Sequence, residues 1–255
     1  MLSGMTAASD LAIVTGTSSG IGAAVASQLV ARGWEVVGIS RRPAHLEHAR
    51  YQHVSLDLSN LQSASPSIEE RLATAVARVR RRLALVNNAA RAGALGPLQH
   101  VARDDIQQTY TLNVAMPLWL MGFVLRHAPD AAVIRIVNVS SAAAVQPIPG
   151  LSGYCSSKAA LRMAGMVFAQ ELESSAGPLA ARDVAVLSYE PGVVDTEMQI
   201  EARSYSEREF PWVGLFKGFR EGGMLVPADA PAAEIVAFAE SVSGPRFQER
   251  RFGDR

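Results

Sequence analysis

The sequence is poor in cysteine and carries no net charge. Its 255 residues include one cysteine, Cys155, and 24 basic side chains balance 24 acidic ones. A single cysteine excludes an internal disulfide and fits a reducing compartment, so we expect a cytoplasmic protein. Without a basic excess, the chain lacks the electrostatic field that attracts nucleic acid or an anionic membrane, and we expect neither as a partner.

Long apolar segments are missing as well. The chain has no run of 18 or more apolar residues, which predicts that it has no membrane-spanning helix. Residues 1–10 lack a basic region followed by an apolar stretch, so we expect no signal peptide, and the sequence leaves open whether Met1 or Met5 is the native start. The longest basic run, residues 78–82, is typical of a helix C-terminus, where cations suit the helix dipole.

The chain instead consists of short apolar runs that alternate with helical segments. Strands are predicted at residues 11–15, 34–40, 53–58, 83–87, 132–140 and 184–189, and helices at residues 23–32, 67–82 (with Ser67 as N-cap), 104–126, 154–174 and 228–241. No linker or low-complexity segment interrupts the alternation. The pattern predicts a single α/β domain over residues 1–255, a doubly wound parallel sheet (Rossmann fold) in a three-layer α/β/α arrangement, which binds ligands at the carboxyl ends of its strands.

Residues 195–227 break the alternation. They are polar and irregular at first and then aromatic, with Phe210, Trp212, Phe216 and Phe219. A long insertion in a compact domain is more often functional than idle. Because this one follows a strand on the ligand side of the sheet, we predict a flap over the substrate; the alternative is a surface excursion that buries its own aromatic side chains.

A glycine-rich loop joins the first strand to the first helix. It reads Gly16, Thr17, Ser18, Ser19, Gly20, Ile21 and Gly22. Glycines let the backbone approach a pyrophosphate closely, and the following helix N-terminus offers free N–H groups and a positive dipole. In this strand–loop–helix context the loop predicts a dinucleotide site.

The end of the second strand indicates which dinucleotide is bound. Proteins that bind NAD place an acidic residue there, whereas an arginine accommodates the 2′-phosphate of NADP. This strand ends in Ser40, Arg41 and Arg42, and Glu35 lies at its opposite end. We therefore predict NADP(H), with Ser40 and Arg41 on the phosphate and Arg42 as a second candidate.

Tyr154 and Lys158 are four residues apart in a predicted helix, so their side chains share one face. A nearby ammonium favours the phenolate and lowers the tyrosine pKa. A tyrosine with a pKa near 7 can act as a general acid or base, and the sequence predicts this chemistry for Tyr154. The alternative is a helix start with an exposed lysine and a half-buried tyrosine.

Together these motifs resemble those of the classical short-chain dehydrogenase/reductase family over nearly the whole chain. The matching positions are Thr15–Gly22, Asp57, Asn87–Ala89, Asn113, Ser141, Tyr154, Lys158 and Pro191–Thr196. Ala90 replaces the glycine that ends the family's N-N-A-G motif. The resemblance implies an NADP-dependent oxidoreductase that acts on C=O or CH–OH groups, and no metal.

The resemblance also implies the roles of four residues. Tyr154 passes a proton to the carbonyl oxygen while the nicotinamide delivers hydride to the carbon, and Ser141 donates a hydrogen bond to that oxygen. Lys158 binds the nicotinamide ribose and lowers the tyrosine pKa. Asn113 holds a water that connects Lys158 to solvent.

Further cofactor contacts follow from the same resemblance. It places Asp57 at the adenine and Thr196, with the backbone of Val194, at the carboxamide. The remaining expected cofactor contacts are Leu58, Asn88, Ala89, Pro191 and Gly192.

The substrate is less clearly indicated. The stretch around residues 190–199 resembles that of sepiapterin reductases and benzil reductases, but Arg251 stands where the former carry an acidic pterin anchor. The flap aromatics favour a small apolar or aromatic ketone or diketone, and we predict Gln146, Pro147, Leu151 and Trp212 as pocket walls. The alternatives are a pterin carbonyl reductase, an NADP-dependent alcohol dehydrogenase and a catalytically silent NADP-binding regulator. The resemblance also implies a homodimer or homotetramer.

Overall fold

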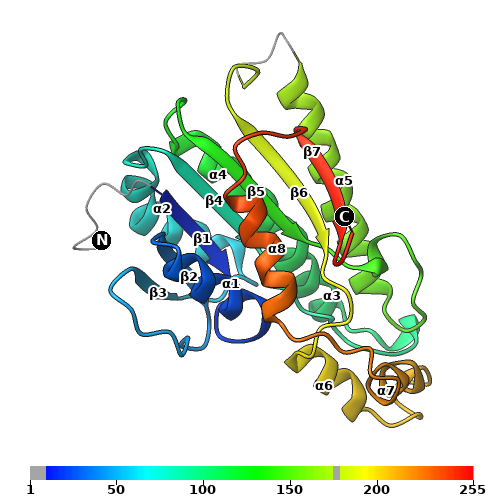
Figure 1. Ribbon diagram of the computed structural model, residues 1–255. Helices are drawn as coiled ribbons and strands as arrows, with labels where there is room; N and C mark the ends of the chain where they lie inside the picture. Colours follow the sequence, from blue (N-terminus) through cyan, green and yellow to red (C-terminus); the bar gives the residue numbers. More distant parts are fainter. Residues whose placement is uncertain (1–9, 175–178, 255) are drawn as a thin grey trace.

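The computed structural model describes residues 10–174 and 179–254, and these form a seven-stranded parallel sheet between two layers of helices (Figure 1). The two candidate start residues, Met1 and Met5, lie outside the described residues. The strands are β1 (Asp10–Thr15), β2 (Glu35–Ser40), β3 (Tyr51–Ser55), β4 (Arg82–Asn87), β5 (Val133–Val139), β6 (Val184–Glu190) and β7 (Phe247–Arg251). Their order is β3-β2-β1-β4-β5-β6-β7, so the winding direction reverses between β1 and β4. The predicted doubly wound parallel sheet is confirmed.

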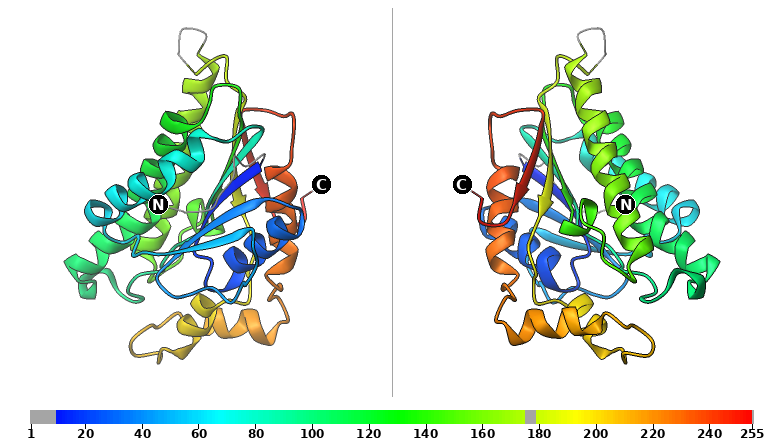
Figure 2. Two further views of the ribbon diagram at one scale, coloured as in Figure 1. Left: turned by 90° about the vertical axis from the view of Figure 1, so that its left-hand side faces the viewer. Right: turned by 90° about the vertical axis from the view of Figure 1, so that its right-hand side faces the viewer.

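Helices cover both faces of the sheet (Figure 2). The helices are α1 (Gly20–Ala31), α2 (Leu61–Ala77), α3 (Arg103–Tyr110), α4 (Met116–His127), α5 (Ser152–Glu173), α6 (Glu197–Ser204), α7 (Val213–Glu221) and α8 (Asp229–Ala239). Side chains alternate along each strand, so Leu11 and Ile13 pack with α2 and α4 on one face, while Ala12 and Val14 pack with α1 and α8 on the other. This two-sided burial explains why the inner strands read as unbroken apolar runs.

The helix predicted at residues 67–82 has different bounds. α2 spans Leu61–Ala77, and Asn60 caps it by accepting a hydrogen bond from the Ser63 N–H at 3.2 Å. Ser67 is therefore not an N-cap: it follows Pro66, which lies inside the helix. The third strand also begins earlier than predicted, at Tyr51, because it pairs with β2 from Val36 onward.

The basic run at residues 78–82 does not simply close a helix. Arg78 is the C-cap of α2, but Arg81 and Arg82 both pair with the buried carboxylate of Asp10, Arg82 at 2.8 Å. Burial works to raise the pKa of Asp10, but the hydrogen bonds from Arg82 and Arg81 outweigh it and hold the pKa below its ordinary value. These ion pairs join the amino ends of β1 and β4, opposite the ligand end of the sheet.

The long helix predicted at residues 104–126 is interrupted. α3 and α4 are joined by a π-helical turn at Thr111–Ala115, which contains Asn113. Such wide turns are often found at functional sites, and here the turn directs the Asn113 side chain into the protein interior, where it is 1% exposed.

The segment 195–227 is more ordered than its sequence indicates. It carries α6 and α7, and a parallel bridge between Val194 and Val226 joins its two ends. Phe210 and Phe216 pack into a small apolar cluster with Leu95 and Leu151, which fastens the segment to the rest of the chain. We call residues 195–227 the flap segment.

The C-terminal tail forms β7, an edge strand that was not predicted. It pairs in parallel with β6 from Val186 to Glu190. Polar and largely exposed side chains at 248–251 hide the strand pattern, which is common at sheet edges. Among the helices of the described residues, none combines the length and apolar character that crossing a membrane requires.

Candidate active site

A cavity of about 550 Å³ opens at the carboxyl ends of the strands, where the sheet order reverses. The loops after β1, β2, β3, β4, β5 and β6 line it, together with α5 and the flap segment. Of the sequence-predicted residues, those that line it are Gly16, Ser18, Ser19, Gly20, Ile21, Ser40, Arg41, Arg42, Leu58, Asn88, Ala89, Ser141, Gln146, Leu151, Tyr154, Lys158, Pro191, Gly192, Val194 and Thr196. The topology therefore gathers segments distant in the sequence around one space.

Two glycines of the loop permit its tight conformation. Gly16 has a φ of +76°, and a Cβ on Gly22 would lie 2.3 Å from the Gly16 carbonyl oxygen. Asn88 holds the loop from β4, because its Nδ2 donates to the carbonyl of Thr15 at 2.9 Å and to that of Gly16 at 3.3 Å. Gly22 therefore shapes the loop rather than lining the cavity.

The N-terminus of α1 faces this cavity with free backbone donors. Its N-cap, Ser19, makes no side-chain capping hydrogen bond. The first-turn N–H groups and the helix dipole therefore suit an anionic group. Together with the close approach that the glycines allow, these features fit the pyrophosphate of a dinucleotide.

Thr17 connects the glycine-rich loop to β3. Its side chain is buried, and its hydroxyl lies 2.9 Å from the Tyr51 hydroxyl, which in turn lies 3.2 Å from His53 Nδ1. Thr17 does not line the cavity, and its link to β3 depends on the pairing of distant segments, which has no local sequence signal.

The carboxyl end of β2 borders the cavity. Ser40, Arg41 and Arg42 line it, and the Arg42 guanidinium pairs with Glu197 at the start of α6. Asp57 does not line the cavity. Burial works to raise the pKa of Asp57, but hydrogen bonds from the Ser59 hydroxyl and N–H outweigh it and hold the pKa below its ordinary value. The Asp57 carboxylate is therefore already hydrogen-bonded to Ser59.

Tyr154 and Lys158 lie one turn apart near the N-terminus of α5, as their spacing predicts. The Lys158 ammonium donates to the Val139 carbonyl at 2.7 Å and lies 5.7 Å from the centre of the Tyr154 ring. Burial lowers the pKa of Lys158 to about 8. Ser141 lines the same cavity, and its Oγ accepts a hydrogen bond from the Ala143 N–H.

The expected fall in the tyrosine pKa is not found in the protein by itself. Burial raises the pKa of Tyr154 to about 12, although the Ser141 hydroxyl works to lower it. The ammonium of Lys158 is directed at the Val139 carbonyl, so it does little to offset the desolvation of the phenolate. At neutral pH Tyr154 therefore carries its proton and can donate it.

Asn113 binds protein groups rather than lining the cavity. Its Nδ2 donates to the Arg91 carbonyl at 2.9 Å and to Ser157 Oγ at 3.0 Å, and its Oδ1 accepts from the Arg91 N–H at 3.0 Å. Ser157 in turn donates to the Tyr154 carbonyl at 2.8 Å. Asn113 thus ties the loop after β4 to the turn of α5 that carries Tyr154.

The two predicted pocket walls Pro147 and Trp212 do not line the cavity, whereas Gln146 and Leu151 do. Trp212 packs on Phe210 beside Gly150 instead. Sequence reasoning missed several lining residues, namely Ala92, Leu95, Ile148, Met198, Gln199, Ala202 and Arg251. Ala92, Leu95 and Ile148 lie in segments without a local motif, and only the fold brings them to the site. The others belong to the predicted flap or, for Arg251, to the position compared with the pterin anchor; like the flap aromatics Phe216 and Phe219, they carry no sequence signal that assigns them to the cavity wall.

No group of three or more potential metal-ligating His, Cys, Asp or Glu side chains occurs within residues 10–174 and 179–254. The cavity brings together a phenol, a hydroxyl and an ammonium, beside a surface suited to a dinucleotide.

Comparisons with known proteins agree with this geometry. A family model described as short chain dehydrogenase matches residues 10–207. The chain is 34% identical over 232 residues to a benzil reductase ((S)-benzoin forming) of Bacillus subtilis (strain 168), covering 91% of this chain and 93% of that protein. It is 32% identical over 215 residues to a sepiapterin reductase of Xenopus laevis, covering 74% of this chain and 75% of that protein. Among solved structures, the KRED1-Pglu enzyme is similar with a TM-score of 0.75 and 25% identity, covering 94% of this chain and all of that one.

Proposed function

Because this chain belongs to the short-chain dehydrogenase family, it is an oxidoreductase that acts on C=O or CH–OH groups with NAD or NADP, and we propose that it uses NADPH to reduce a small apolar or aromatic ketone or diketone. The observation that carries the proposal is that Tyr154, Ser141 and Lys158 line one cavity together with the glycine-rich loop after β1. The choice of cofactor, the direction and the substrate each rest on a separate feature.

NADPH is supported by the end of β2. Arg41 and Arg42 line the cavity there, and no carboxylate follows the strand. Glu35, at the other end of β2, pairs with Arg50 at 2.8 Å and is remote from the cavity. The Arg41 guanidinium and the Ser40 hydroxyl suit a 2′-phosphate, whereas Arg42 is paired with Glu197, which reaches the cavity from α6 and not from the end of β2.

Replacing Arg41 tests this assignment. Arg41→Ala is expected to weaken NADPH binding roughly 10–100-fold, since a hydrogen bond to a charged group contributes about 1.5–3 kcal/mol. NADH, which lacks the phosphate, should bind within about twofold of the unmodified protein. Fluorescence titration with both cofactors measures the difference, and Arg50→Ala is the matched control. Equal weakening of NADPH and NADH would show that Arg41 does not read the phosphate.

The cofactor, when bound, supplies the hydride that reduces the carbonyl carbon. Tyr154 donates its proton to the carbonyl oxygen, and the Ser141 hydroxyl donates a hydrogen bond to the same oxygen as negative charge develops there. Lys158 is placed to hold the nicotinamide ribose, and Thr196 with the backbone of Val194 to hold the carboxamide. Asn113 acts as a positioning residue through Ser157.

Tyr154 carries the proton that the reductive direction requires. A phenol with a pKa near 12 is ready as an acid at neutral pH, whereas oxidation requires the phenolate. The alternative role as an NADP-dependent alcohol dehydrogenase would need the bound, cationic nicotinamide to lower this pKa substantially.

The substrate class is supported by the apolar half of the cavity. Leu95, Ile148 and Leu151 line it with the flap aromatics Phe216 and Phe219. Arg251 also lines it, and its guanidinium pairs with Glu190 at 3.2 Å, so this corner offers no free acid to anchor a pterin. The relative named benzil reductase points to the same aromatic diketone class.

A carbonyl panel tests the function as a whole. NADPH oxidation is followed at 340 nm with benzil, other aromatic diketones, simple ketones and sepiapterin. We expect turnover on the aromatic diketones and little on sepiapterin. Preferred turnover on sepiapterin would overturn the substrate class, and tight NADPH binding without turnover on any compound would favour the silent regulator.

We also propose a homodimer or homotetramer that pairs through α4 and α5. Leu118, Met163 and Val167 are apolar and exposed on these helices, whereas Met121 is buried and belongs to the core. Exposed apolar side chains on neighbouring helices are typical of an interface. Light scattering at micromolar concentration should give at least twice the chain mass of 27.2 kDa, and a monomer would remove the proposal.

A further inference from the structure

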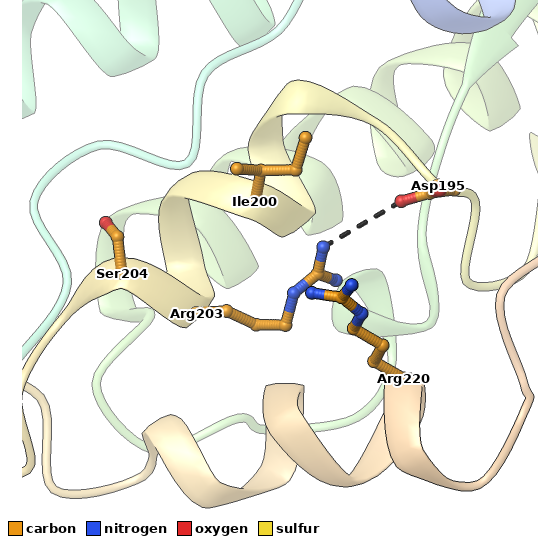
Figure 3. Close-up of a pocket in the computed structure, with 5 residues that line it drawn as sticks. All are labelled: Asp195, Ile200, Arg203, Ser204 and Arg220. Carbon is orange, nitrogen blue, oxygen red and sulfur yellow. Dashed lines mark ion pairs between the residues drawn. The ribbon is translucent and has the colours of Figure 1, made fainter.

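A second cavity lies on the far side of α6 from the active site. It has a volume of about 420 Å³ and is lined by Asp195, Ile200, Arg203, Ser204 and Arg220 (Figure 3). α6 separates the two spaces, since Met198, Gln199 and Ala202 line the catalytic cavity from the same helix. The active-site chemistry described above makes no use of this second cavity.

Two arginines from different helices line it. Arg203 projects from α6 and Arg220 from α7, and both side chains border the same space (Figure 3). The nearest carboxylate, Asp195 Oδ1, is 3.8 Å from Arg203 Nη2, and Gln199 Oε1 is 3.5 Å from Arg203 Nη1. Arg220 makes no ion pair with any part of the chain that the structure describes. One distant carboxylate therefore faces two cations.

Arg203 differs in this respect from the other shielded arginines. Its side chain is only 11% exposed, yet both of its polar contacts are longer than an ordinary hydrogen bond. By contrast, Arg135 binds Asp183 at 2.8 Å and Arg82 binds Asp10 at 2.8 Å. Guanidinium donors that are sheltered from water but weakly paired favour an anion that can accept from them in a bidentate manner.

We propose that this cavity is a binding site for a small phosphate or carboxylate anion, held between Arg203 and Arg220. An anion there would neutralise the repulsion of the two cations and accept hydrogen bonds from both. The space exceeds that of a bare phosphate, and the exposed side chain of Ile200 forms an apolar wall, so a small organic acid or phosphate ester fits.

The site is connected to the active site through α6. Gln199 lines the catalytic cavity and accepts the long hydrogen bond from Arg203. Asp195 directly precedes Thr196, which also lines the catalytic cavity. An anion that draws Arg203 toward Arg220 would release Gln199 from its hydrogen bond and hold α6 against α7. Because Gln199 lines the catalytic cavity, anion binding would change the position of a side chain in the cavity wall.

Isothermal titration calorimetry of the full chain with inorganic phosphate and with citrate, at constant ionic strength maintained with KCl, tests the site. We expect saturable binding in the millimolar range or tighter. Arg203→Gln and Arg220→Gln should each weaken it at least tenfold. Arg208→Gln, an exposed arginine of the same segment outside the cavity, should leave it unchanged. Tighter citrate than phosphate assigns the carboxylate class, and the reverse order assigns the phosphate class.

The cofactor cavity is the competing location for a bound anion, and Arg41→Ala separates the two. Binding that survives Arg41→Ala and is lost in Arg220→Gln supports the proposal. Binding lost in Arg41→Ala but intact in Arg220→Gln overturns it, as does the absence of saturable heat with both probes. Because Arg220 is exposed on α7, its variant keeps the test valid even if Arg203→Gln fails to fold.

Discussion

Tyr154→Phe is expected to lower kcat roughly 10³-fold while leaving NADPH affinity within about twofold of its original value. The substitution removes only the hydroxyl that donates the proton, and positioned acid catalysis contributes about 10²–10⁴-fold. The ring keeps its place in the first turn of α5, so the cavity retains its shape. Steady-state reduction of benzil and fluorescence titration of NADPH provide the two readouts.

Tyr110→Phe is the matched control for this experiment. Tyr110 is 37% exposed at the end of α3 and does not line the cavity, so its variant should keep full turnover. Retained turnover in Tyr154→Phe would refute the role of Tyr154. A parallel loss of NADPH binding would show instead that the hydroxyl has a structural role.

Lys158→Met is expected to abolish turnover and yet stabilise the fold. Burial lowers the pKa of Lys158 from 10.5 to about 8, which corresponds to about 3 kcal/mol at 1.36 kcal/mol per pKa unit. Loss of the hydrogen bond to the Val139 carbonyl offsets about 1–2 kcal/mol of this. The net gain of about 1–2 kcal/mol should raise Tm by about 2–8 °C at pH 7.

The pH dependence of stability distinguishes removal of the buried ammonium from a general packing effect as the cause of the higher Tm. Because the folded pKa of Lys158 lies below the unfolded value, the unfolded chain binds the proton more tightly, and the free energy of unfolding rises as pH increases from about 8 to 10.5. The rise should disappear in Lys158→Met, so the advantage of the variant is largest below pH 8. Lys217→Met, at the only other lysine, should keep the rise. An unchanged pH profile in Lys158→Met would contradict the assignment.

The fold and the central motifs could be predicted from the sequence because the patterns that indicate them are local. Strands such as β1 and β4 are buried on both faces and therefore read as apolar runs, and the glycine-rich loop follows the first of them directly. Tyr154 and Lys158 are related by one helical turn, which the spacing alone specifies.

The features that the sequence did not reveal depend on contacts between distant segments. The π-helical turn at Asn113 is stabilised by the backbone of Arg91, and β7 is recognisable only through its pairing with β6. The pKa of Tyr154 reflects how deeply the folded chain buries the phenol, which the four-residue spacing to Lys158 does not report. Leu95 reaches the cavity from a loop with no motif at all.

The bridge between Val194 and Val226 gives the flap segment a common point of departure and return. The Asp195 N–H donates to the Val226 carbonyl at 3.0 Å, and the Val226 N–H donates to the Val193 carbonyl at 2.9 Å. The residues between these hydrogen bonds form a loop that is closed at its base. The entropic cost of closing such a loop grows only slowly with its length. The segment can therefore be shortened, lengthened or grafted from a relative while β6 and α8 stay in place. Chimeras that exchange the segment but keep Thr196 and Glu197, which lie on the cofactor side of the cavity, would transplant substrate preference as a module.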